Sequence, residues 1–145
     1  MRDLHNNITV DKALETIVVN NDSEGTGEVI DLQGFEAAEM VVNVGESGDT
    51  LSGSVKFDLI LQEGEESDGS DMAAVSDADD LIGASSSTFQ TIAAASEDGA
   101  VYSVGYVGTY RYIRLYVDVT GTHTNGTPIG AVCVKHRDRH IGTTV

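Results

Sequence analysis

The clearest structural signal in the sequence spans positions 111–119, which read Arg111-Tyr112-Ile113-Arg114-Leu115-Tyr116-Val117-Asp118-Val119. Aliphatic residues occupy every second position from Ile113 to Val119, and tyrosine or charged residues stand between them. A period of two is typical of a strand that turns one face to a core and the other to solvent. The stretch therefore predicts a half-buried β-strand in a protein built from sheets.

Similar short runs recur along the chain, separated by clusters of glycine, aspartate, asparagine and serine that favour turns. The expected strands are 14–19, 28–32, 37–44, 55–62, 101–107, 111–119 and 129–135. No segment has a sustained period of 3.6, and the one helical candidate is a single turn at 77–82, capped by Ser76 or Asp77. We expect an all-β fold, an antiparallel β-sandwich or jelly roll of about seven to eight short strands.

The chain of 145 residues is long enough to bury one core. We expect a single β-sandwich domain over 1–145, with a short N-terminal arm at 1–8 and a C-terminal tail at 136–145, since neither end has a core-forming pattern. The acidic stretch 63–97 is expected to be a long solvated connection between the sheets. The side chains predicted to fill the core are Phe57, Leu59, Leu61, Ile113, Leu115, Val117 and Val119.

The formal net charge of −16 argues against nucleic acid and anionic membranes as partners, because both repel an acidic surface. The charge is also uneven along the chain. Residues 1–110 hold 22 of the 24 acidic residues, whereas residues 111–145 hold five of the eight basic ones. An acidic body with a basic end predicts attachment to an acidic neighbour or to another copy of the chain. The alternative is that the acidic residues only keep the protein soluble.

Cys133 is the single cysteine, so no internal disulfide can form, and we expect a protein made in a reducing cytoplasm. The first residues, 1–7, have no apolar run after the basic Arg2 and do not resemble a secretory signal. No apolar stretch is long enough for a membrane helix.

Two clusters contain residue types that bind metals. The carboxylates at 68–80 offer oxygen ligands for calcium, but their spacing lacks the glycine and terminal glutamate of an EF-hand, which favours a solvated acidic loop. Cys133, His136 and His140 have part of a zinc-site spacing, and His5 or His123 would have to supply the fourth ligand. A thiol in an apolar strand more often packs as a small hydrophobe. We therefore expect no metal and no cofactor.

The sequence contains none of the usual catalytic signatures: no nucleophile elbow, no zinc-protease motif and no phosphate-binding loop. We expect that the protein is not an enzyme. The five tyrosines, Tyr102, Tyr106, Tyr110, Tyr112 and Tyr116, all lie within residues 102–116. They predict either a cross-strand ladder that stiffens a sheet or, beside two arginines, an interface. A carbohydrate-binding module that uses exposed tyrosines stays open as an alternative.

Several runs of the sequence look like parts of one pattern. They are Asp3-Leu4-His5-Asn6-Asn7-Ile8, Asn20-Asn21-Asp22, Ile30-Asp31-Leu32-Gln33-Gly34-Phe35-Glu36, Ser76-Asp77-Ala78-Asp79-Asp80-Leu81-Ile82-Gly83 and Val104-Gly105-Tyr106-Val107-Gly108-Thr109-Tyr110-Arg111-Tyr112-Ile113-Arg114-Leu115. In this order and spacing they resemble small proteins encoded in the head modules of tailed phages and prophages, near the major capsid gene. None of these runs is a catalytic motif, and together they cover nearly the whole chain.

The resemblance implies a capsid decoration or cement protein: a β-rich virion protein, without a cofactor, that binds the outside of the shell and ties neighbouring major capsid subunits together. A head–tail joining or minor head protein is the nearest alternative. We expect a homo-oligomer, a trimer over a threefold axis or else a dimer over a twofold. The candidates for contact with the capsid or with sister subunits are Arg111, Tyr112, Arg114, Tyr116, Arg137, Arg139 and His5.

Overall fold

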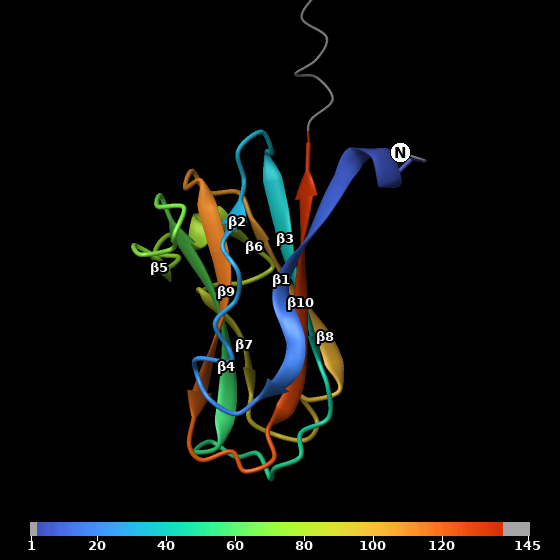
Figure 1. The fold of residues 1–145 in the computed structure, drawn as a ribbon, viewed down its shortest axis with the longest axis vertical. Coiled ribbons are helices and arrows are strands. Elements are labelled where there is room, and N and C mark those ends of the chain that lie inside the picture. Colours follow the sequence, from blue (N-terminus) through green and yellow to red (C-terminus); the bar gives the residue numbers. More distant parts are fainter. Residues whose placement is uncertain (1–2, 138–145) are drawn as a thin grey trace, which may run out of the picture.

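The structure, a computed structural model, describes residues 3–137 and is a sandwich of two antiparallel five-stranded sheets that pack face to face (Figure 1). The predicted fold class is confirmed, and the sheets do not close into a barrel. The first sheet, here sheet A, has the order β1-β10-β3-β8-β6; the second, sheet B, has the order β2-β9-β4-β5, with β7 also paired to β4.

The strands of sheet A are β1 Ile8–Val19, β10 Thr127–His136, β3 Ala37–Val44, β8 Ala100–Tyr106 and β6 Leu81–Ile82. Those of sheet B are β2 Ile30–Asp31, β9 Tyr112–Thr120, β4 Lys56–Gly64, β5 Ala73–Ala74 and β7 Thr88–Ile92. Two 3₁₀ turns, η1 His5–Asn7 and η2 Ala78–Asp80, complete the elements of the described residues. No helix of the described part of the chain is long and apolar enough to cross a bilayer.

The predicted strand at 111–119 is β9, and it lies in the middle of sheet B between β2 and β4. Its aliphatic residues face the core as expected, and Leu115 is paired with Leu61 of β4. Of the seven predicted core side chains, six have no exposed surface and Val119 is partly buried. The interior between the sheets is therefore the core that the alternating pattern indicated.

The strands β1 and β10 extend further toward the two ends of the chain than the sequence suggested. The first strand begins at Ile8 rather than at residue 14, because Ile8 to Lys12 pair in register with His136 to Val132 of β10. The polar residues of this stretch concealed it, since β1 is an edge strand with two register shifts. His136 belongs to β10 and not to the tail. Residues 1–2 and 138–145 of the expected arm and tail lie outside the described residues.

The stretch 63–97 is only partly the solvated connection that was expected. It crosses between the sheets, adding β5 to sheet B, β6 to sheet A and β7 to sheet B. Val75, Leu81 and Ile92 are buried in the core. The expected helical turn is shorter than predicted: Asp77 caps η2 by accepting a hydrogen bond from the backbone N–H of Asp79, and Leu81 already belongs to a strand.

Candidate functional site

Basic side chains gather at the end of the sandwich where β10 finishes, around Phe35 in the loop between β2 and β3. The Nζ of Lys135 lies 4.2 Å from the centre of the Phe35 ring, and the guanidinium carbon of Arg137 lies 5.1 Å from it. Arg111 stands on the neighbouring loop between β8 and β9. We call Arg111, Lys135 and Arg137, together with Phe35, the basic end; it collects three of the eight basic residues of an acidic chain.

Arg111 is held in place by Asp31 of β2. Its Nε and Nη2 donate hydrogen bonds of 3.0 and 2.9 Å to the two carboxylate oxygens of Asp31. This bidentate pairing lowers the pKa of Asp31 to about 2, against an ordinary value near 4. The guanidinium also lies 5.0 Å from the centre of the Tyr112 ring. Arg111 is still 42% exposed, so it is fixed in orientation and open to a partner.

Lys135 joins several elements at this end. Its ammonium contacts Asp11 of β1 at 2.6 Å and donates to the backbone carbonyl of Asp31 at 3.1 Å. The side chain is nearly buried, with 8% exposed, so its role is to position Phe35 and β2. Arg137, like Arg111, is exposed to solvent.

A hollow of about 250 Å³ lies beside the basic end. Its lining is mixed: the apolar and aromatic residues are Leu32, Phe35, Ala37, Tyr106 and Tyr110, and the polar ones are Gln33, Glu36, Thr109 and Arg111. The two loops that form it connect β2 to β3 and β8 to β9, and they meet at the end where β10 leaves the sandwich (Figure 1). A hollow lined by aromatic and polar side chains is suited to a partner side chain with an apolar body and a polar end, and Arg111 and Arg137 beside it would attract a neighbouring carboxylate.

His5 lies in η1, close to the basic end. The ring Nδ1–H of His136 donates to the backbone carbonyl of Asn7 at 3.2 Å, and the backbone N–H of Arg137 contacts the same oxygen at 3.5 Å. These bonds hold η1 against the end of β10. The structure therefore brings three of the predicted contact residues, His5, Arg111 and Arg137, to one end of the molecule.

The other predicted contact residues lie elsewhere. Arg114 and Tyr116 are on the outer face of sheet B, where the guanidinium of Arg114 donates twice to Gln62, at 2.9 and 2.7 Å. Tyr112 is buried beneath Arg111. Arg139 lies outside the described residues. Sequence reasoning missed Phe35 and Lys135; the charge count contained Lys135, but nothing in the sequence indicated that it stacks on an aromatic ring.

The five tyrosines do not form an exposed ladder. Tyr106 is buried between the sheets, and the hydroxyl of Tyr102 donates to the backbone carbonyl of Glu97 at 2.6 Å. Tyr110, 40% exposed, lines the hollow. Neither Tyr106 nor Tyr112 is available for an interface: Tyr106 alternates with Val104 toward the core, and Tyr112 is buried outside the core cluster with Arg111 over its ring.

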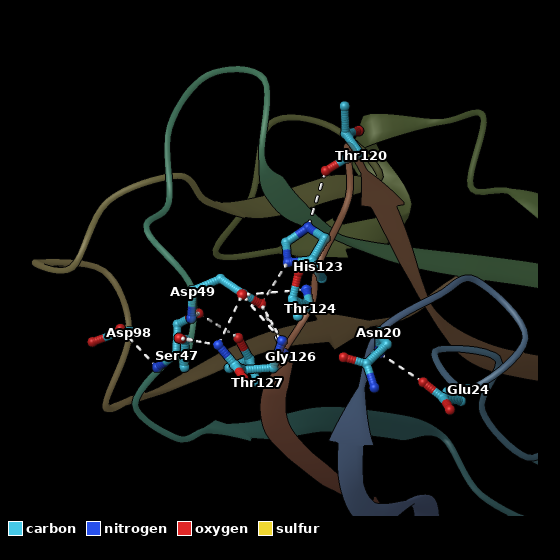
Figure 2. Close-up of polar contacts among 12 residues, drawn as sticks. Asn20, Glu24, Ser47, Asp49, Asp98, Thr120, His123, Thr124, Gly126 and Thr127 are labelled. Atoms are coloured by element: carbon cyan, nitrogen blue, oxygen red, sulfur yellow. Dashed lines mark hydrogen bonds and ion pairs between the residues drawn. The ribbon is translucent and has the colours of Figure 1, made fainter.

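The opposite end of the sandwich is closed by Asp49 (Figure 2). Its carboxylate, on the loop between β3 and β4, accepts backbone N–H bonds from Thr124, Asn125 and Gly126 on the loop between β9 and β10. These donors lower the pKa of Asp49. His123 lies next to it, with Nδ1 3.8 Å from Asp49 Oδ2 and Nε2–H donating to the carbonyl of Thr120 at 3.0 Å. The cluster ties the loop between β3 and β4 to the loop between β9 and β10, so we assign it to stability.

The metal-ligand patterns of the sequence can be followed only in part, because His140 lies outside the described residues. Within residues 3–137, no group of three or more histidine, cysteine, aspartate or glutamate side chains is arranged to hold a metal ion. Cys133 points into the core, where burial raises the pKa of its thiol to about 12. In the acidic loop, Asp71 accepts backbone N–H bonds from Glu65 and Glu66 and thereby shapes a turn.

Comparisons with protein-family models, with curated proteins and with solved structures found no match for this chain.

Proposed function

We propose that this chain is a structural virion protein that binds the outer surface of a tailed-phage capsid and stabilises contacts between major capsid subunits. The observation that carries the proposal is the basic end: on a protein of net charge −16, Arg111 lines a hollow and Arg137 stacks on Phe35 of the same hollow. The resemblance of the sequence to phage head-module proteins supplies the partner.

The basic end suits a protein contact better than a small substrate. Arg111 is held rigidly by Asp31, and Arg137 stacks on Phe35, so both cations are presented with little loss of side-chain freedom on binding. An acidic segment of a capsid subunit would pair with these cations and place an apolar side chain in the hollow. Each such contact is weak in water, but a lattice of many identical sites multiplies it.

A small sandwich is also suited to tying subunits together. Its two sheets are locked at one end by Asp49 and at the other by Arg111, Asp31 and Lys135. A rigid body placed over a joint between subunits resists their separation through the area that it buries on each of them.

The test is binding of the purified chain to undecorated shells, with occupancy measured after sedimentation. The proposal predicts saturable binding that falls as salt is raised from about 0.1 to about 1 M, because the Debye length shortens from about 10 to about 3 Å. The variant Arg137→Glu should bind more weakly, and the double variant Arg137→Glu/Arg139→Glu more weakly still.

The control for the single variant is Lys56→Glu, which makes the same change in net charge on β4, away from the basic end; because Lys56 pairs with Asp58, its melting temperature is measured alongside. It should bind like the unchanged protein. Absence of binding by the unchanged protein would remove the capsid proposal altogether. Full occupancy by the double variant would remove the basic end from the contact.

A further inference from the structure

The outer face of sheet A carries exposed valines on several strands, among polar side chains such as Lys12, Glu15 and Asn43. Residues alternate along each strand, and those that pair with one another across the face include Val10 with Val134, and Val132 with Val41. Val101 of β8 and Ile82 of β6 extend the same face and are among the most exposed large hydrophobic residues, at 63% and 59%. A single exposed valine is ordinary, whereas here valines of neighbouring strands stand in pairs, bordered by Lys12 and Ser103 in one row and by Glu39 in the other.

Two hollows mark this face. The larger, about 400 Å³, has Gly130, Val41, Val101 and Val132 among its lining residues. The smaller, about 170 Å³, lies where Gly105, Val107, Ile82 and Val134 meet. Valines that project beside these hollows give the surface the raised and sunken parts that two copies need in order to interlock.

The face is nearly neutral on a strongly acidic protein. The fixed charges that line its two hollows are Lys12, Glu15 and Glu39, a balance of one negative charge, whereas the whole chain carries −16. Two copies repel one another over most of their surface. They repel least where these faces meet.

The size of the face is also sufficient. The four long strands of sheet A, β1, β10, β3 and β8, lie about 4.8 Å apart and rise about 3.3 Å per residue, which gives a face of roughly 500 Å². Two such faces bury about 1,000 Å² in total, the lower limit for a specific interface.

We propose that the outer face of sheet A binds the same face of a second copy. The two A sheets then face one another across a twofold axis that lies between the two copies. A contact that uses one patch on both subunits closes after two copies, so it favours the dimer over the trimer expected from the sequence. The dimer is a property of the free protein and is independent of the proposed function, since the basic end lies at the edge of the sandwich rather than on this face.

The proposal has a distinctive dependence on salt. Apolar contacts persist in salt, and screening weakens the repulsion between two acidic bodies. Raising the salt from about 0.1 to about 1 M should therefore strengthen the dimer, whereas the same change should weaken attachment through the basic end.

The first experiment is sedimentation velocity of the full chain over a range of concentrations at both salt levels. We expect a monomer–dimer equilibrium that shifts to dimer in high salt. Val101→Glu should raise the dissociation constant about tenfold or more, because it places a charge in the apolar contact. Leu4→Glu is the matched control, since Leu4 is equally exposed, at 61%, but lies outside sheet A, and it should change little.

The second experiment locates the contact. Val132 lies on β10, one of the two strands between β1 and β8, and a Val132→Cys variant should be cross-linked between copies by a short bis-maleimide. A Leu4→Cys variant should not be. The native Cys133 is buried and should stay unreacted in both.

Two results would overturn the proposal: a monomer at all concentrations in high salt, or a dimer that is insensitive to Val101→Glu and not cross-linked through position 132. A monomeric chain whose Val101→Glu variant loses occupancy on shells would assign this face to the capsid instead, which also overturns the dimer. Sedimentation velocity is measured on the free chain, without shells. A chain that stays monomeric there leaves the capsid proposal standing, and a chain that does not bind shells leaves the dimer standing.

Discussion

The hydroxyl of Tyr106 donates a hydrogen bond of 2.7 Å to Oε2 of Glu63, and this bond joins the two sheets through the interior. Tyr106 ends β8 of sheet A, and Glu63 is on β4 of sheet B; both are buried. The other carboxylate oxygen of Glu63 accepts the backbone N–H of Ser76 at 3.3 Å. Burial, with the bond to Glu63, raises the pKa of Tyr106 well above its ordinary value. The phenol therefore remains a donor over the whole working range of pH.

Removing this donor should be costly. Tyr106→Phe leaves one oxygen of a buried carboxylate without its partner, so the free energy of unfolding should fall by about 1–3 kcal/mol. Urea titration at neutral pH measures the change. The control is Tyr102→Phe, which removes a hydroxyl bonded to an uncharged carbonyl and should cost less. Equal losses in the two variants would show that the sheet-to-sheet bond has no special weight.

Shortening a core side chain of sheet B should destabilise the folded protein. Leu115 has no exposed surface, so Leu115→Ala should lower the free energy of unfolding by about 2–5 kcal/mol through lost burial and a residual cavity. Val101→Ala, on the exposed face of sheet A, should stay within about 0.5 kcal/mol. A melting temperature for Leu115→Ala that matches that of the unchanged protein would contradict the packing described here.

The fold was predictable wherever one face of a strand alternates clearly. The stretch 111–119 and the run Phe57 to Leu61 became paired central strands, because period two survives when one side is buried and the other solvated. The beginning of β1 was not predictable, since Thr9, Asp11 and Lys12 are stabilised by pairing to β10 and not by burial. β5 and β6 have two residues each, too few to show a period.

The site was predictable only as a charge imbalance. Counting showed that the C-terminal part is basic, and the structure places Arg111 and Arg137 at one end. Two contacts were not visible in the sequence. Arg111 pairs with Asp31, which lies 80 positions away, and Lys135 of β10 stacks on Phe35 of the loop between β2 and β3. Such long-range pairs depend on the order of strands, which no local pattern contains.

Asp49 should make stability depend on pH. Its pKa is lowered in the folded state, so its contribution is complete above the ordinary value near 4 and is lost as the pH falls below it. Asp49→Asn should melt at a lower temperature than the unchanged protein at pH 7. Between about pH 5 and about pH 3 the difference in melting temperature between the two proteins should narrow, because Asp49 of the unchanged protein becomes protonated and loses its charge.

Melting curves at several pH values test this, and only the difference between the two proteins is diagnostic, since acid also protonates Asp31 in both. A gap in melting temperature that stays constant down to about pH 3 would show that the carboxylate charge does not hold the two loops together.

Cys133 should be unreactive in the folded protein. Its thiol is fully buried and has a pKa of about 12, so both access and the thiolate fraction are low at neutral pH. A thiol reagent such as Ellman's reagent should react slowly with the native protein and rapidly after addition of denaturant. Reaction of the native protein at the denatured rate would contradict the placement of β10.

The most direct test of the capsid proposal is a cryo-electron microscopy reconstruction of shells incubated with the purified chain. The proposal predicts additional density on the outer surface, repeated over the whole lattice at the joints between major capsid subunits, into which the sandwich fits with Arg111 and Arg137 toward the shell. Density confined to a ring at one vertex would indicate a head–tail joining protein instead, and a bare outer surface would contradict the proposed function.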